Sequence, residues 1–261
     1  MKAKSIFGIL IFLCFSILCN SCVYAAQDTV YSWYCKRNNE HKQPTVDSSM
    51  QFIDQYGGYY VDKNHGDDSE DKVIYLTFDA GYENGNISKI LDTLKAENVS
   101  GAFFILGHLI NSHPELILRM VNEGHTVANH TKSHKDMTIP SDFEEFKAEL
   151  EGLEALYLNV TGVNLSRYYR PPEGKFDERS LKYATDMGYK TIFWSLAYAD
   201  WDNNNQMAQD KAMKKILDNI HNGAVILLHP TSETNAAILK DLITTLRSQG
   251  YRFGTLDELT K

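Results

Sequence analysis

The stretch HTKSH contains two histidines at a spacing that suits a metal ion. His130 and His134 lie four residues apart, so on one helical turn, or on the bend entering it, both imidazoles can face one point. Imidazole nitrogens are common ligands of transition metals. Two ordinary surface histidines would show the same spacing, but His130 also ends an apolar stretch, TVANH at 126–130, that predicts a strand.

Further ionisable residues stand at the ends of other apolar stretches. They are Asp79 after VIYLTF, Arg170 in RYYRPP, Asp200 with Trp201 after YKTIFWS, and His229 at the end of AVILLH. Each has a simpler structural explanation on its own: a cap, an ion pair, a turn residue or a hydrogen-bonded core residue. Ligands bind at the carboxyl ends of parallel strands, because the loops that follow the strands open there. Together these residues predict one site that combines carboxylates, imidazoles, a guanidinium and an indole.

The elements that must position these residues alternate between strand-like and helix-like patterns. Apolar stretches predict strands at 73–78, 101–107, 126–130, 167–172, 189–195, 224–229 and 251–256. Apolar residues at helical spacing, a proline start and glycine stops predict helices around 87–94 and at 114–124, 142–158, 177–187, 206–221 and 235–249. The strand before Asp79 lacks polar alternation, so it is expected to be buried on both faces, as in parallel sheets. About seven βα units with right-handed crossovers close into a β/α barrel or a doubly wound sheet.

The first 25 residues have the pattern of a secretory signal peptide. A basic start and an apolar run at 6–18 precede a small-residue pattern, and cleavage is expected after Ala25. An uncleaved membrane anchor is the alternative, although the run is shorter than the roughly 20 residues that span a bilayer. Three of the four cysteines lie in this segment, so the exported chain keeps Cys35 and has no internal disulfide.

Residues 26–72 form an N-terminal extension that precedes a catalytic domain at 73–261. The extension is polar, rich in turn residues and spotted with aromatic side chains. Trp33, Phe52 and Tyr59 either pack it against the domain or offer aromatic faces to a sugar groove.

The charge balance excludes a polyanionic partner such as nucleic acid. The net charge is −8 and the isoelectric point is about 5.6, and no basic patch with interleaved aromatic residues occurs. Surfaces that bind phosphate backbones need clustered lysine and arginine.

Five motifs, in this order along the chain, resemble those of the polysaccharide deacetylases of the NodB-homology type, carbohydrate esterase family four: TFDAG, HTKSH, RPPEG, ADW and ILLH. The resemblance covers about 73–259 and implies a distorted (β/α) barrel of about seven βα units. TFDAGYENG, YSWYCKRNNEHKQP and SLAYADWD are more similar to the branch that deacetylates N-acetylmuramic acid for the muramic δ-lactam of spore cortex. The resemblance thus implies an N-deacetylase that acts on peptidoglycan glycan strands. With the signal-peptide pattern, the expected location is extracellular, in the cell wall or in spore cortex, and the protein is expected to be a monomer.

The resemblance also implies a catalytic role for four residues. Asp79 becomes the general base that takes a proton from the attacking water, and Arg170 holds its carboxylate. His229 becomes the general acid that protonates the departing sugar amine, because an amide nitrogen leaves only when protonated. Asp200 orients His229 and keeps its imidazole charged by raising its pKa.

Metal and substrate residues follow from the same resemblance. His130 and His134 are expected to hold a divalent metal that polarises the acetamide oxygen, and zinc, cobalt, nickel and iron all suit such ligands. The residues expected to contact substrate are Trp201, which walls the groove, with Tyr82, Pro171, Glu173 and Gly174.

Two positions depart from the family pattern. Ala80 stands where TFDDG has a second aspartate as third metal ligand, and Ala197 stands where a DxxDW pattern begins. The muramic branch itself departs from aspartate at the first of these positions, so Ala80 fits that branch better than the general family. Water, Asp79 or Glu83 is expected to fill the vacant metal positions, and Ala80→Asp is expected to tighten metal binding.

Three alternative functions remain open from the sequence. A general N-acetylglucosamine deacetylase would share the same motifs. A non-catalytic glycan-binding protein would account for the missing ligand at Ala80. A glycoside hydrolase would use Asp79 and Glu83 as its carboxylate pair, although both lie on one tight turn.

Overall fold

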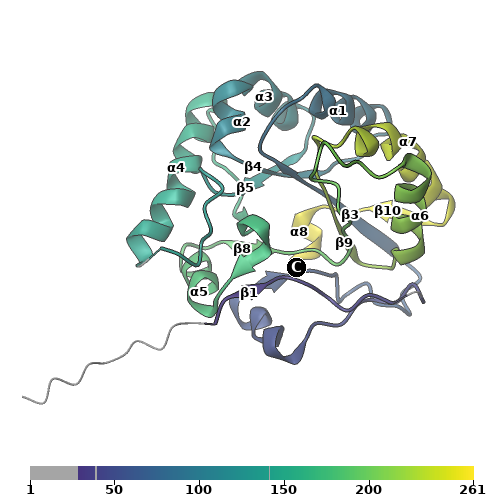
Figure 1. Cartoon of the computed structure of the whole chain (residues 1–261), viewed down its shortest axis with the longest axis horizontal. Helices are drawn as coiled ribbons and strands as arrows, with labels where there is room; N and C mark the ends of the chain where they lie inside the picture. Colours follow the sequence, from purple (N-terminus) through teal and green to yellow (C-terminus); the bar gives the residue numbers. More distant parts are fainter. Residues whose placement is uncertain (1–28, 39, 141) are drawn as a thin grey trace, which may run out of the picture.

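The computed structural model of the chain describes residues 29–38, 40–140 and 142–261 (Figure 1). The predicted signal peptide at 1–25 lies outside the described residues. Figure 1 shows the strands in the interior, most helices around the outside, and the N-terminal segment, here residues 29–71, along the lower side. No helix in the described part of the chain is both long and apolar enough to cross a membrane.

A curled sheet with entirely parallel pairing forms the centre of the molecule. Its strand order is β10 (Tyr251–Phe253), β3 (Lys72–Ala80), β4 (Ala102–Ile105), β5 (Thr126–Asn129), β6 (Tyr168–Tyr169), β8 (Lys190–Ile192) and β2 (Gly58–Tyr59), and β9 (Ala224–Leu228) also pairs with β3. Beyond β8, a parallel bridge joins Leu196 to Ile226 of β9 and brings the sheet round on itself. The predicted distorted barrel is therefore confirmed, and a doubly wound sheet is wrong because an open sheet would not meet itself here.

Strand β3 is buried on both faces, as its unbroken apolar run predicts. Val73 and Tyr75 point into the barrel, where they pack with residues of β4, β5, β6 and β9. Ile74, Leu76 and Phe78 point outward and pack against the surrounding helices. This alternation places Asp79 on the inward side, at the carboxyl end of the strand.

Most helices in the described part of the chain cover the outer face of the barrel, and the last one packs against its interior. They are α1 (Asn86–Ala96), α2 (Gly107–Ser112), α3 (Pro114–Asn122), α4 (Phe143–Thr161), α5 (Glu178–Asp186), α6 (Gln209–Asn219), α7 (Glu233–Ser248) and α8 (Leu256–Leu259). Two of them were not predicted, because the strands expected at 101–107 and 251–256 end earlier and short helices α2 and α8 begin there. Leu256 and Leu259 of α8 join the apolar cluster inside the barrel.

The N-terminal segment is part of the barrel wall. Strand β2 pairs with β8 in the central sheet, and β1 (Tyr31–Ser32) pairs antiparallel with β7 (Lys175–Phe176). The 3-10 helix η1 (Ser48–Tyr56) supplies Met50 and Ile53 to an apolar cluster with Trp33, Phe176 and Phe193. The alternative in which Trp33, Phe52 and Tyr59 pack the extension against the domain is therefore observed.

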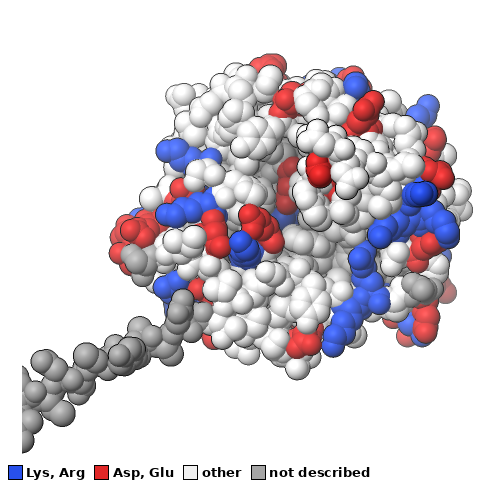
Figure 2. Space-filling model, viewed as in Figure 1, with Lys and Arg blue, Asp and Glu red and all other residues white. Residues whose placement is uncertain are grey.

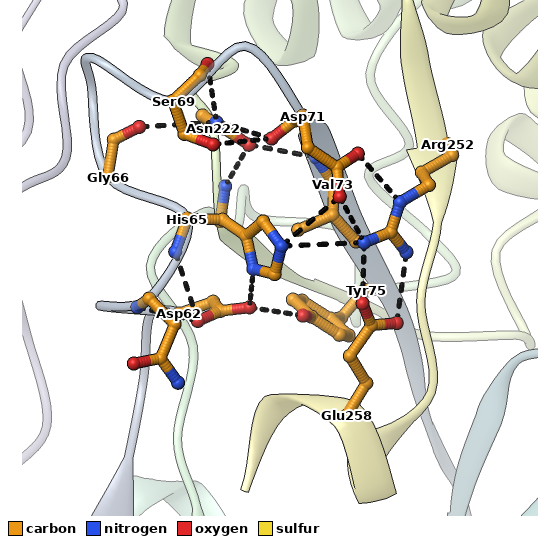
Figure 3. Close-up of polar contacts among 12 residues, drawn as sticks. Asp62, His65, Gly66, Ser69, Asp71, Val73, Tyr75, Asn222, Arg252 and Glu258 are labelled. Atoms are coloured by element: carbon orange, nitrogen blue, oxygen red, sulfur yellow. Dashed lines mark hydrogen bonds and ion pairs between the residues drawn. The ribbon is translucent and has the colours of Figure 1, made fainter. Parts of the chain in front are cut away.

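A polar network fastens residues 62–71 to the amino ends of the strands (Figure 3). The buried carboxylate of Asp62 accepts hydrogen bonds from the Tyr75 hydroxyl and from Nδ1 of His65, the latter at 2.7 Å. Nε2 of His65 lies 3.2 Å from Asp71, which also accepts hydrogen bonds from Arg252 at 2.7 and 2.8 Å. The network thus ties the loop to β3, β10 and, through Glu258, α8.

Candidate active site

Asp79 and Arg170 form a buried ion pair at the carboxyl ends of β3 and β6. Nη1 of Arg170 donates to Oδ1 of Asp79 at 2.7 Å, and the two side chains are 0% and 9% exposed. Burial alone would raise the pKa of Asp79, but the positive charge of Arg170 and the nearby His130 and His229 lower it below its usual value. Asp79 is therefore a carboxylate at neutral pH.

Arg170 is held rigidly by acceptors that satisfy its remaining donors. Its Nε donates to the Ile192 carbonyl at 2.9 Å, and its Nη2 donates to the Thr77 hydroxyl at 2.9 Å and to the Phe193 carbonyl at 3.2 Å. The guanidinium also lies 4.1 Å from the ring centre of Phe104. A buried charge needs such pairing, because its desolvation would otherwise destabilise the fold.

His229 and Asp200 form a second pair beside β9. Nδ1 of His229 lies 2.7 Å from Oδ1 of Asp200, and the His229 backbone N–H donates to Oδ2 at 2.8 Å. Asn235, in the first turn of α7, donates to the same Oδ2 at 2.6 Å. Burial lowers the pKa of His229, but the hydrogen bond and charge of Asp200, with the charge of Asp79, raise it overall. The imidazole is one-quarter exposed, so its other nitrogen is available to a ligand.

His130 and His134 lie on an irregular loop after β5 and not on a helical turn. The loop is tightly bonded: Asn129 Oδ1 accepts from the Thr131 N–H at 2.8 Å, and the Thr131 hydroxyl accepts from the His134 N–H at 2.9 Å. Thr131 and His134 have φ of 71° and 59°, which is the left-handed backbone conformation. This conformation is most unfavourable for Thr131, because its side chain is β-branched. Such strain persists where the surroundings impose it, and it places the two imidazole rings 5.1 Å apart.

The donor atoms of this loop fit a divalent transition metal in part. Nδ1 of His130 bonds to the Arg170 carbonyl at 2.8 Å, which leaves Nε2 as the free nitrogen, 3.6 Å from Oδ2 of Asp79. Burial lowers the pKa of His130 to about 4, so its imidazole is neutral, as a ligand must be. In the described residues, no group of three or more His, Cys, Asp or Glu side chains is arranged around one point. The chain thus supplies two imidazoles, with the Asp79 carboxylate beside one of them.

A cavity of about 810 Å³ lies over these groups. Asp79, His130, His134 and His229 line it together. The N-terminal segment contributes another part of the wall: Trp33, Tyr34, Cys35 and Arg37. Figure 2 shows one face of the molecule hollowed near its centre, with uncharged side chains making up most of the surrounding surface.

The residues expected to contact substrate occupy different depths. Tyr82 and Trp201 line the cavity and are 59% and 63% exposed, so their aromatic faces are open to a sugar ring. Glu173 and Gly174 line it from η2 (Pro172–Gly174), whereas Pro171 is buried beneath and does not belong to the lining. Gly174 has φ of 65°, and a Cβ there would lie 2.8 Å from the Trp194 ring, so only glycine fits.

Glu83, one of the three candidates for the vacant metal positions, does not line the cavity. Its carboxylate accepts hydrogen bonds from the backbone N–H groups of Gly85 and Ile87 at 2.6 and 3.0 Å and caps the start of α1. The same contacts remove it as the partner of Asp79 in a glycoside hydrolase. Ala80 is fully buried in the apolar cluster between the sheet and the helices, and it does not line the cavity.

Sequence reasoning missed several residues that position the site. Asn235 and Thr77 hold Asp200 and Arg170, and Asn129 shapes the histidine loop. An asparagine or threonine in the first turn of a helix or in a strand gives no sequence signal beyond a cap or a β-former. The strand-end position of Asn129, next to His130, is the one signal that could have pointed to it.

Comparisons with known proteins bear on the family of the chain. The sequence profile of the family described as Polysaccharide deacetylase matches residues 66–192. Peptidoglycan-N-acetylmuramic acid deacetylase PdaA of Bacillus subtilis (strain 168) is 39% identical over 229 residues, which cover 87% of this chain and 85% of that protein. The chain belongs to the polysaccharide deacetylase family. The resemblance of its five motifs is thereby confirmed, and as a carbohydrate esterase family 4 deacetylase the chain is a hydrolase of amide bonds.

This polysaccharide deacetylase shares its fold with solved structures. The structure of Bacillus subtilis PdaA, a family 4 carbohydrate esterase, matches with a TM-score of 0.82 at 38% identity, covering 88% of this chain and 96% of that one. A relative with another stated specificity, peptidoglycan-N-acetylglucosamine deacetylase PgdA of Listeria monocytogenes, is 36% identical over 188 residues. That match covers 72% of this chain and 39% of the Listeria protein. Polysaccharide deacetylases of this family are metal-dependent in general.

Proposed function

We propose that this polysaccharide deacetylase removes the acetyl group from N-acetylmuramic acid residues of peptidoglycan. The observation that carries the proposal is that Asp79, paired with Arg170, and His229, paired with Asp200, line the same cavity. Amide hydrolysis needs a base for the attacking water and an acid for the departing nitrogen. Asp79 is the proposed base and His229 the proposed acid, because against the opposing effect of burial Arg170 lowers the pKa of Asp79 and Asp200 raises the pKa of His229.

In the proposed mechanism, Asp79 accepts a proton from a water molecule as the water attacks the acetamide carbon. Arg170 fixes the orientation of the carboxylate through its 2.7 Å hydrogen bond and keeps it ionised. His229 then donates its proton to the sugar nitrogen, and Asp200 holds the imidazole by its Nδ1 so that Nε2 is the atom that donates. Acetate and a free amine are the products.

His130 and His134 are proposed to hold a divalent cation, zinc being one that suits two imidazoles with oxygen ligands. When bound, such a cation would polarise the acetamide carbonyl. The 2.8 Å bond from His130 to the Arg170 carbonyl supports this role, because metal-binding imidazoles commonly donate their second nitrogen to a carbonyl. A chelator is expected to reduce activity, and adding zinc should raise the unfolding temperature of the wild type but not of His134→Gln.

The muramic specificity is supported by how much of the chain each relative matches. The match to the muramic acid deacetylase covers 87% of the chain, which is more than residues 73–261 contain, so it includes part of the N-terminal segment. The match to the glucosamine deacetylase covers 72%. The N-terminal segment lines the cavity, so similarity there bears on the substrate.

We further propose that the protein is exported and acts as a monomer on glycan strands of the cell wall. The signal-peptide pattern at 1–25 supports export. In the muramic product, the freed amine lies beside the lactyl carboxyl group of the same sugar, so that closure to a muramic δ-lactam can follow. Spore cortex, which contains that lactam, is the proposed location.

Acetate release from three substrates tests the proposal. Peptide-free glycan strands, peptide-bearing strands and N-acetylglucosamine oligomers are incubated with the full chain and a divalent metal, with Asp79→Asn as the inactive control. We expect acetate from the peptide-free strands and unchanged glycan chain length. Acetate from the glucosamine oligomers alone would identify a general glucosamine deacetylase, and binding without acetate would identify a glycan-binding protein.

A further inference from the structure

The segment 33–37 lies along residues 194–197, and alternate side chains of the segment donate hydrogen bonds to backbone carbonyls of those residues. Trp33, Cys35 and Arg37 donate hydrogen bonds to the carbonyls of residues 194, 195 and 197, at 2.8, 3.4 and 2.8 Å. Alternate side chains of an extended chain share one face, which is why these three reach the same neighbour. The segment therefore forms a fixed part of the cavity wall.

Arg37 brings a positive charge to this wall. Of the described residues that line the cavity, Arg37 is the one lysine or arginine, and it forms no ion pair with a described carboxylate. Its bond to the Ala197 carbonyl uses one N–H, which leaves most of the donors of the guanidinium available. Asp79, by contrast, already has Arg170 as its partner. An anionic group on a ligand would be the natural partner for Arg37.

Ala197 keeps this cation free for a ligand. It lines the cavity and anchors Arg37 through its backbone, and its methyl group offers no competing charge. An aspartate at this position would place a carboxylate next to the guanidinium. An uncharged side chain at 197 therefore leaves the guanidinium of Arg37 able to form charge-assisted hydrogen bonds with a ligand.

We propose that Arg37 binds the lactyl carboxylate of peptide-free N-acetylmuramic acid and so selects this acidic sugar over neutral amino sugars. The inference rests on the proposed function. The lactyl group and the acetamide are on adjacent ring carbons, so a carboxylate can bind at the wall while the acetamide lies between Asp79 and His229. A peptide on the lactyl group converts the carboxylate to an amide, which removes the charge that Arg37 recognises.

The experiment compares one glycan in two charge states. Peptide-free muramic glycan is used with free lactyl carboxylates or with the carboxylates converted to methyl amides, and acetate release gives kcat and KM. Arg37→Gln is expected to lower kcat/KM on the acidic glycan about 10- to 100-fold, mainly through KM, since it removes a charge-assisted hydrogen bond. Its kcat/KM on the amidated glycan should equal that of the wild type. Ala197→Asp should weaken the acidic preference in the same way, and Arg37→Lys should restore part of it.

Lys36→Gln is the matched control, because Lys36 is the neighbouring cation, pairs with Asp47 at 3.4 Å and does not line the cavity. It should leave both substrates unaffected. Equal losses for Arg37→Gln on both glycans would indicate a structural role and overturn the inference, as would an unchanged preference for the acidic glycan. A wild-type protein inactive on both muramic glycans would overturn the proposed function as well, which separates the two failures.

Discussion

At the carboxyl ends of the strands, an Asp–Arg pair and an Asp–His pair face a cavity of about 810 Å³. At the amino ends, Asp62, His65, Asp71 and Arg252 form a series of ion pairs that connects residues 62–71 to the barrel (Figure 3). The residue types are the same, but only the first set contributes residues, Asp79 and His229, to the lining of the cavity. The difference teaches that charge pairing alone does not mark a catalytic site, because the same pairs also fasten loops.

The largest expected effect separates the two ends through their histidines. His229→Gln should lower kcat by about 10²- to 10⁴-fold, because it removes the general acid, with little change in unfolding temperature. His65→Gln, the matched change at the other end, should leave kcat unchanged and lower the unfolding temperature. Acetate release gives kcat, and thermal unfolding gives the unfolding temperature, for each of the two variants. Equal activity losses in the two variants would mean that the ends are not functionally distinct.

Ala80→Asp tests the apolar position next to the catalytic base. Without metal, a carboxylate in this fully buried apolar cluster should destabilise the protein by about 3 kcal/mol or more. If the new carboxylate reaches the ion held by His130 and His134, added zinc should recover that stability and bind more tightly than in the wild type. Calorimetric titration with zinc gives the affinity, and no gain over the wild type would refute the third-ligand role of this position.

Asp62→Asn should weaken the network at the amino ends. The hydrogen bonds from Tyr75 and His65 would then reach a neutral acceptor, so we expect the free energy of unfolding to fall by about 1–3 kcal/mol. Urea unfolding measures the loss, and kcat at 25 °C should stay at the wild-type value. A large fall in kcat would show that this network also controls the site.

The location of the candidate site residues could be predicted from the sequence, because the carboxyl ends of parallel strands lie at one edge of the sheet. Asp79, His130 and His229 each end or follow a buried strand, so their proximity follows from topology once the strands are known. The inward orientation of Asp79 and the outward orientation of Ala80 follow from the period of the strand, but which face is inward depends on packing that an unbroken apolar run does not reveal.

The contribution of the N-terminal segment could not be predicted. Arg37 is held by the carbonyl of residue 197, which is 160 positions away. Every residue type has a backbone carbonyl, so the sequence carries no complementary side chain that would indicate the contact. Asn235 was missed for a related reason, since an asparagine in the first turn of α7 looks like a capping residue until its bond to Asp200 is seen.

The smallest expected effect is a shift in pH dependence. His229 must carry its proton to act as the acid, so activity should fall as pH rises through its pKa, which Asp200 raises against the effect of burial. Asp200→Asn removes that charge, so the falling limb of the kcat–pH profile should move to lower pH. The acidic limb should stay in place, because Arg170 still holds the pKa of Asp79 low. An unmoved alkaline limb would contradict the role of Asp200.

The buried pair of Asp79 and Arg170 also has a consequence for how the chain folds. The two residues are 91 positions apart, so the guanidinium has no carboxylate until β3 and β6 stand in the same barrel. A sheet assembled with β6 shifted along β5 would bury Arg170 among apolar side chains without its partner, at a cost of several kcal/mol. We therefore expect the pair to favour the native strand register during folding, because a barrel with β6 misaligned would leave the buried Arg170 without its carboxylate and would be less stable.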